Sequence, residues 1–135
     1  DAAGISFPSE FELIPPADVT GESWGRQILR EWLDAGKPYT ALFTLGENVA
    51  LSLLSEAVVL GVRIPDELSV ISCDNLPFSE MTGPPLSVIQ IPNRRSGFRA
   101  TKLVWEHLQT GQAPDKGKPL EVVDVIQRQS TAPPS

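Results

Sequence analysis

The sequence predicts an α/β fold built on a doubly wound, mostly parallel sheet. Apolar strand-like runs alternate with segments of helical period, which is typical of βαβ units. The runs ALFTL and LSVISC are continuous rather than alternating, as in central strands that helices cover on both faces. With 135 residues, 41% hydrophobic and 21% charged, we expect one compact globular unit.

Five short apolar segments are predicted as strands, separated by turns rich in glycine and proline. They are Phe11–Ile14, Thr40–Leu45, Leu68–Cys73, Leu86–Ile91 and Glu121–Gln127.

Three helices are predicted between these strands. The first follows Thr20, a plausible N-cap, sets Trp24, Ile28 and Trp32 on one stripe and ends at Gly36. The second runs from about Asn48 to Leu60, and its apolar residues cover an arc of roughly 200°, about twice what one core contact requires. We therefore expect the second helix to pack on the sheet and on a second surface.

The third helix, about Asn93 to Thr110, is amphipathic and strongly basic near its start. Four of the 11 basic residues lie between positions 94 and 102: Arg94, Arg95, Arg99 and Lys102. Basic side chains in a first turn oppose the helix dipole unless an anion compensates, so one hypothesis is an effector with a phosphate or carboxylate. The simpler alternative, which we favour, is a solvated face with Lys102 paired to Glu106.

Charge and motifs exclude several classes of protein. A net charge of −6 lacks the electrostatic footprint of a nucleic-acid-binding domain, so any DNA contact must be made elsewhere. The single cysteine, Cys73, excludes an internal disulfide, and the single histidine, His107, has no second ligand at metal-binding spacing. No cofactor loop, nucleophile elbow, membrane span or signal peptide is found, so we expect a non-enzymatic, metal-free, cytoplasmic protein.

An ordered set of motifs resembles the lac repressor/galactose repressor family of transcription regulators. In order, they are Gly46-Glu47 after a strand, the 48–60 helix, the Gly61–Glu67 turn, the 68–73 strand with Asp74-Asn75, the Gly83–Leu86 turn and the ending Arg128–Pro134. The resemblance spans the chain from about Ala3 onward. The chain begins without a cap or initiator Met, and we interpret it as a fragment.

The resemblance implies a fold like that of the sugar-binding periplasmic proteins, in which a ligand cleft lies between two lobes. This chain would carry the second lobe, at about 1–91 and 120–131. The helix at about 92–112 would cross to the first lobe. The DNA-binding domain would lie upstream, so operator DNA is contacted only through that missing part.

The resemblance also implies residues that contact the effector. They are Val19, Gly46, Glu47, Asp74, Asn75, Ile91, Asn93 and Arg94. Asp74 follows a buried strand at the carboxyl end, where open α/β sheets bind ligands, and we favour ligand contact over a turn-capping role. Glu47 has two alternatives, a ligand contact or a favourable charge in the first turn of its helix. Gly46, Val19 and Ile91 depart from the residues usual in the family, so we expect a different effector from that of well-studied members.

Family members dimerise through the second helix and the turn after Asp74. The implied interface comprises Leu51, Leu54, Ser55, Val58, Phe78 and Met81. The alternative is that Leu51, Leu54 and Val58 are buried within the lobe. We expect a homodimer that senses a sugar or related metabolite without turnover, with a periplasmic sugar-binding protein and a small flavodoxin-like enzyme as alternative functions.

Overall fold

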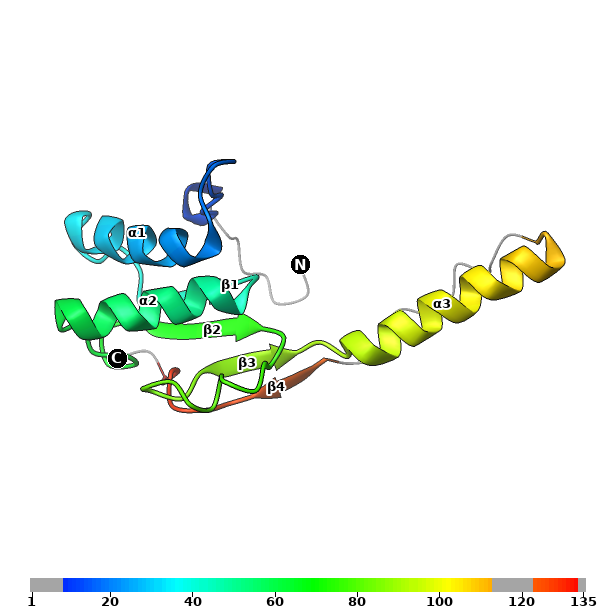
Figure 1. Cartoon of the computed structure of the whole chain (residues 1–135). Coiled ribbons are helices and arrows are strands. Elements are labelled where there is room, and N and C mark those ends of the chain that lie inside the picture. The colour runs from blue at the N-terminus through cyan, green and yellow to red at the C-terminus, as the bar shows by residue number, and fades with distance from the viewer. Residues whose placement is uncertain (1–8, 113–122, 134–135) are drawn as a thin grey trace.

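The computed structural model of the chain describes residues 9–112 and 123–133. Its elements, in chain order, are η1 (Ser9–Phe11), α1 (Gly21–Asp34), β1 (Ala41–Thr44), α2 (Glu47–Leu60), β2 (Ser69–Cys73), β3 (Ser87–Gln90), α3 (Asn93–Thr110) and β4 (Asp124–Ile126). Figure 1 shows a lobe of sheet and two stacked helices, from which α3 extends away.

The sheet has the order β1-β2-β3-β4, with β1, β2 and β3 parallel and β4 antiparallel to β3. The predicted α/β fold with a mostly parallel sheet is therefore confirmed. Four of the five predicted strands form within one or two residues of the expected bounds, apart from positions 121 and 122, which lie outside the described residues.

Helices α1 and α2 build the core on one face of the sheet. Thr20 caps α1, accepting a hydrogen bond from the Ser23 amide, and Gly61 ends α2 in the left-handed conformation at φ 70°. The core residues come from α1, α2, the strands and the turns that flank them. They are Trp24, Ile28, Leu29, Trp32, Ala50, Leu53, Leu54, Ala57, Val62, Leu68, Val70, Leu86 and Val88.

The expected helical cover on both faces of the sheet is not met among the described residues. Helix α1 packs on α2, and α2 packs on β1 and β2, so both helices lie on one side (Figure 1). Strand β1, predicted to be central, lies at the edge of the described sheet, and its Phe43 is 49% exposed. A continuous apolar run predicts burial of both faces, but it does not specify which segment provides the cover.

The predicted strand at 11–14 is wrong. Ser9–Phe11 forms a single 3-10 turn, and residues 12–14 join no ladder of the described sheet. A strand exists only when a neighbouring strand satisfies its backbone N–H and C=O groups, and no described segment does so here.

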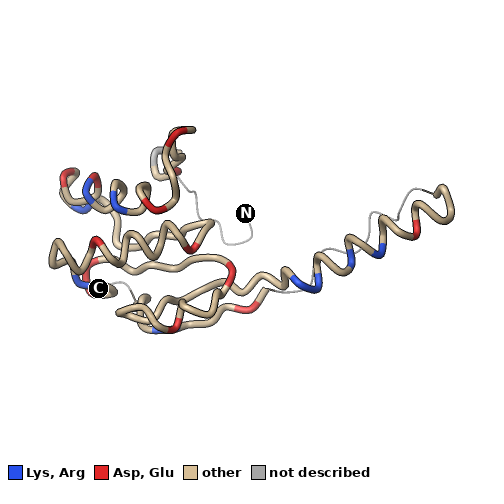
Figure 2. The backbone as a smooth tube through the Cα atoms, viewed as in Figure 1, with Lys and Arg blue, Asp and Glu red and all other residues tan. Residues whose placement is uncertain are grey.

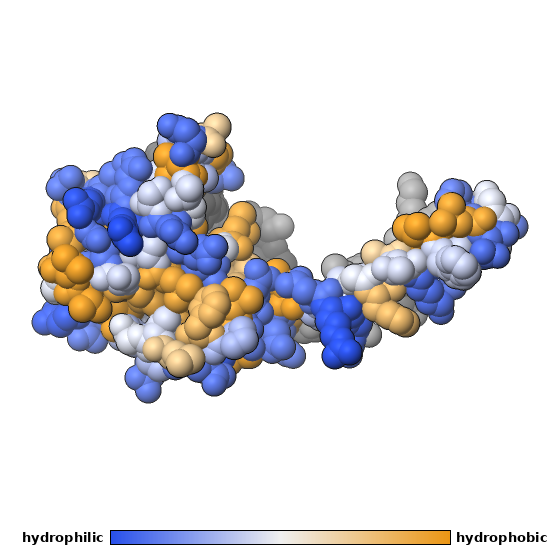
Figure 3. Space-filling view, viewed as in Figure 1, coloured by the Kyte–Doolittle hydropathy of each residue, from blue (hydrophilic) through white to orange (hydrophobic). Residues whose placement is uncertain are grey.

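Helix α3 matches its predicted bounds but packs against no other described element. Its apolar side chains Phe98, Val104, Trp105 and Leu108 are all exposed, and Figure 3 shows apolar side chains gathered on its outer part. No helix in the described ranges is both long and apolar enough to cross a lipid bilayer.

Candidate ligand-binding cleft

A cleft of about 790 Å³ lies where the carboxyl ends of β2 and β3 meet the start of α3. In Figure 1 the arrowheads of both strands point toward α3. The lining residues are Asp74, Asn75, Leu76, Gln90, Ile91, Pro92, Asn93, Arg94, Arg95, Phe98 and Asp124. This is the edge at which open α/β sheets bind their ligands.

Asp74 enters the cleft through a sharp backbone turn directly after β2. Its φ is 98° and that of Asn75 is 79°, both in the left-handed region that few non-glycine residues adopt. The Asp74 amide donates to the Ile89 carbonyl (3.0 Å), and its Oδ1 accepts from Nδ2 of Asn93 (2.9 Å). The carboxylate therefore joins the sheet edge to the first residue of α3.

Five of the eight predicted ligand contacts line this cleft: Asp74, Asn75, Ile91, Asn93 and Arg94. Two of the other three lie elsewhere. Gly46 lines a second, apolar cavity of about 580 Å³ beside β1, and Val19 is half-buried and packs against the core.

Glu47 is the third, and it points into the lobe rather than into the cleft. Its side chain is buried, at 2% exposure, because the carboxylate is enclosed by the turn that follows Asp74. Oε1 accepts from the amides of Asn75 (2.5 Å) and Leu76 (3.0 Å), and Oε2 accepts from the Ser79 hydroxyl (2.7 Å). Both oxygens of Glu47 are thus engaged within the lobe, and the residue does not line the cleft. It lies in the first turn of α2, where a negative charge is favourable, as in the second of the two alternatives.

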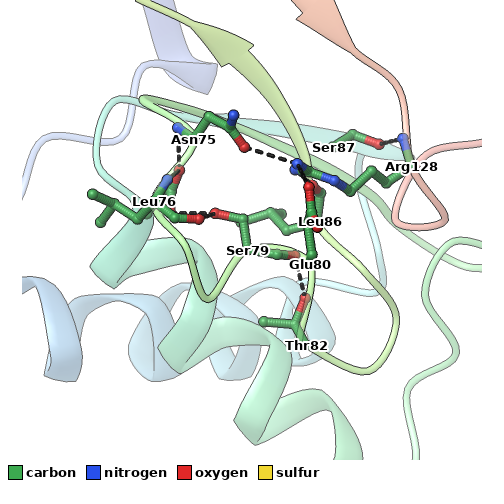
Figure 4. A network of polar contacts seen from close by, with 9 residues as sticks. Asn75, Leu76, Ser79, Glu80, Thr82, Leu86, Ser87 and Arg128 are labelled. Atoms are coloured by element: carbon green, nitrogen blue, oxygen red, sulfur yellow. Dashed lines mark hydrogen bonds and ion pairs between the residues drawn. The ribbon is translucent and has the colours of Figure 1, made fainter. Parts of the chain in front are cut away.

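Arg128 also contacts the turn that follows Asp74, a role that the sequence did not reveal. Its guanidinium donates to the Leu86 carbonyl (2.7 Å), to Oδ1 of Asn75 (2.8 Å) and to Glu80 (2.9 Å), as Figure 4 shows. The only signal in the sequence was its place at the start of the ending motif.

The charges around the cleft are mixed. Two acidic residues, Asp74 and Asp124, and two basic residues, Arg94 and Arg95, line it together. Figure 2 shows that the basic residues of α3 begin at its junction with the sheet. Lys102 pairs with Glu106 at 3.7 Å, as the solvated-face alternative predicted. Burial, and then the charge of Asp74, raise the pKa of the Cys73 thiol at the end of β2.

The wide apolar arc of α2 divides between the core and the surface. Leu54 is 3% exposed and belongs to the core, so it is not available as an interface residue, and Leu51 is half-buried. The arc is exposed at its far side, where Val58 is 72% exposed. The other predicted interface residues, Ser55, Phe78 and Met81, are exposed as well.

The cleft offers hydrogen-bonding groups and one aromatic ring. Carboxylate and amide side chains beside Phe98 suit a small polar ligand that presents several hydroxyl groups. Among the residues that the structure describes, no cluster of His, Cys, Asp or Glu is arranged to hold a metal ion.

Similarity to known proteins agrees with this geometry. Residues 3–131 match the periplasmic binding protein-like domain family. The chain is 33% identical over 120 residues to the HTH-type transcriptional repressor CytR of Escherichia coli K12, covering 89% of this chain and 35% of CytR. It is 40% identical over 107 residues to the repressor PurR of Vibrio vulnificus, covering 79% of this chain and 31% of PurR.

The fold is also found in solved structures. A LacI family transcriptional regulator from Enterococcus faecium with bound ribose superposes with a TM-score of 0.72 at 30% identity, covering 89% of this chain and 43% of the regulator. The chain spans about a third of the length of CytR and PurR, the two curated relatives named above. It belongs to the periplasmic binding protein-like domain family, and it is homologous to the repressors CytR and PurR and shares its fold with regulators of the LacI family.

Proposed function

We propose that this chain is the effector-binding part of a transcriptional regulator and that the cleft at Asp74 binds a sugar or related small metabolite. The observation that carries the proposal is Asp74 itself, which lies at the carboxyl end of a buried strand and lines the cleft with Asn75 and Asn93. Homology to named repressors favours regulation over transport or catalysis. Function is then differential binding without turnover, in the cytoplasm.

The division of the chain between two lobes is part of this proposal. We assign residues of about 1–91 and 120–131 to the second lobe, although 1–8 and 120–122 lie outside the described residues. Helix α3 would cross to a first lobe that the rest of the protein supplies. The apolar face of α3, which packs on no described element, supports this arrangement. Operator DNA is bound by a separate domain, since this chain carries a net charge of −6.

Ribose is the first ligand to test, because a structural relative at 30% identity contains it. Calorimetry on the full-length protein is expected to detect binding that Asp74→Asn weakens by roughly ten-fold, the loss expected when a charged hydrogen-bond acceptor is removed. Asp66→Asn, an exposed aspartate on a distant turn, is the matched control and should bind as the wild type does. Equal affinity in Asp74→Asn and the wild type would remove Asp74 from the site.

A homodimer formed through α2 and the turn after β2 is the second part of the proposal. Val58 and Met81 are 72% and 83% exposed, and Val58 continues with the exposed Val59 and Leu60 at the end of α2. Contiguous exposed apolar patches are typical of interfaces. Val58→Asp is expected to give monomers in sedimentation velocity of the full-length protein, whereas Thr40→Asp at an exposed polar position should not. A Val58→Asp protein that sediments as a dimer would exclude this face.

A further inference from the structure

The turn that carries Asp74 into the cleft has a backbone conformation that is uncommon outside glycine, and that Asp and Asn adopt more readily than other residues. Two successive non-glycine residues, Asp74 and Asn75, have positive φ angles of 98° and 79°. Such residues persist only where their surroundings fix them. Something in the lobe must therefore hold this turn.

Glu47 supplies that restraint from inside the lobe. The amides of Asn75 and Leu76 converge on a single oxygen, Oε1, at 2.5 and 3.0 Å. Successive N–H groups that converge in this way form an anion-binding concavity, and here a side chain of the same lobe fills it. Because Glu47 lies in the first turn of α2, its backbone is fixed by a helix packed into the core.

The other contacts of the turn engage side chains or the Asp74 amide. Arg128 holds the Asn75 side chain through Oδ1 at 2.8 Å, and Ser79 Oγ donates to Oε2 of Glu47 at 2.7 Å (Figure 4 shows the Arg128 contact). The Asp74 amide is fixed to β3 through the Ile89 carbonyl. Among the described contacts, only those of Glu47 reach the amides of Asn75 and Leu76.

We propose that Glu47 is a positioning residue for effector binding: its buried carboxylate holds the 74–76 turn so that the Asp74 carboxylate faces the cleft. This inference rests on the proposed role of Asp74 as an effector contact. It also gives Glu47 a part in recognition although its side chain is closed off from the cleft.

The test uses the full-length protein with Glu47→Gln, which keeps the size of the side chain and removes its charge. Hydrogen exchange of the Asn75 and Leu76 amides is expected to accelerate by roughly ten-fold, because charged acceptors make the stronger hydrogen bonds. Ribose affinity measured by calorimetry is expected to fall by a similar factor. Glu56→Gln is the matched control, since Glu56 is also buried on α2 but pairs with Arg30 (2.6 Å), and exchange at 75 and 76 should stay unchanged.

A rescue variant separates positioning from a merely structural role. Glycine adopts positive φ without steric cost, so Asn75→Gly added to Glu47→Gln should recover part of the lost ribose affinity, judged against Asn75→Gly alone. The proposal is overturned if Glu47→Gln leaves the exchange of the Asn75 and Leu76 amides unchanged, or if the affinity lost is the same with and without glycine at 75.

The two proposals fail in distinguishable ways. A wild-type protein that does not bind ribose contradicts ribose as the effector, and the exchange of the Asn75 and Leu76 amides then decides the role of Glu47. Unchanged exchange in Glu47→Gln would overturn the positioning role even if the wild type binds ribose tightly.

Discussion

At position 74, a carboxylate that directly follows an apolar strand becomes part of the cleft because two successive residues adopt a left-handed backbone. The sequence predicted the place of Asp74, since strand ends at the carboxyl edge are the ligand sites of open α/β sheets. It left the role of Glu47 open, because the choice between cleft and interior depends on where the 75–79 turn lies relative to α2.

Cys73, immediately before Asp74, is expected to be an unreactive thiol. It is buried, and burial followed by the negative charge of Asp74 raises its pKa, while the thiolate is the reactive form. Reaction with a disulfide reagent at pH 8 should be at least roughly a hundred-fold slower in the native protein than in urea. Rapid labelling of the native protein would show that the site opens frequently.

The same raised pKa predicts a dependence of stability on pH. The folded-state pKa lies above that of the unfolded thiol, so the unfolded chain loses its proton first as the pH rises. The contribution of the Cys73 thiol to the free energy of unfolding is thus complete below the ordinary thiol pKa. It is lost as the pH rises toward the thiol pKa of the folded protein. Urea unfolding at increasing pH should show that the free energy of unfolding declines, and that it declines less in Cys73→Ala.

The contact between α1 and α2 depends on one glycine. A Cβ built at Gly25 would lie 2.1 Å from Ser52 Oγ and 2.1 Å from the Val49 carbonyl oxygen, and a backbone atom of a packed helix cannot yield cheaply. Gly25→Ala is therefore expected to lower the free energy of unfolding by about 2 kcal/mol or more, as overpacking does. Urea denaturation followed by circular dichroism measures the change.

Gly97 in α3 provides the matched control, because a Cβ there meets no atom within 4 Å. Gly97→Ala in a helix interior should be neutral or stabilising by about 0.5–1 kcal/mol. Equal effects of the two substitutions would contradict the close packing of α1 on α2.

For helix α2, the apolar periodicity predicted two contact surfaces but not which residues belong to each. Its wide apolar arc indicated two partners, and the structure assigns Leu54 to the core and leaves Val58 exposed. The sequence could not divide the arc, because Leu54 and Val58 are both apolar and lie four residues apart, on the same side of the helix wheel. Only the position of the sheet beneath the helix separates the two residues.

At the scale of the whole molecule, α3 is the element whose apolar side chains no other described element covers. Its Trp105 is 62% exposed, whereas Trp24 and Trp32 are buried in the core. If α3 packs on a first lobe, iodide should quench a large part of the fluorescence of the 135-residue chain but much less of that of the full-length protein. Trp105→Phe identifies its share of the signal, and equal quenching in both proteins would contradict the crossing helix.

By itself, the sequence determined the α/β class, the bounds of all three helices and of β1, β2 and β3 within one or two residues, the presence of β4, and Asp74 as a cleft residue. These features follow from local signals: apolar periodicity, the Thr20 cap, the Gly61 end and a charge directly after a buried strand. Tertiary structure alone decided that 11–14 is not a strand, that β1 lies at the edge of the sheet formed by the described residues, and that the Glu47 side chain is buried in the lobe. Each of these depends on a partner distant in sequence, since strand pairing and the burial of a charge are set by which backbone groups lie opposite.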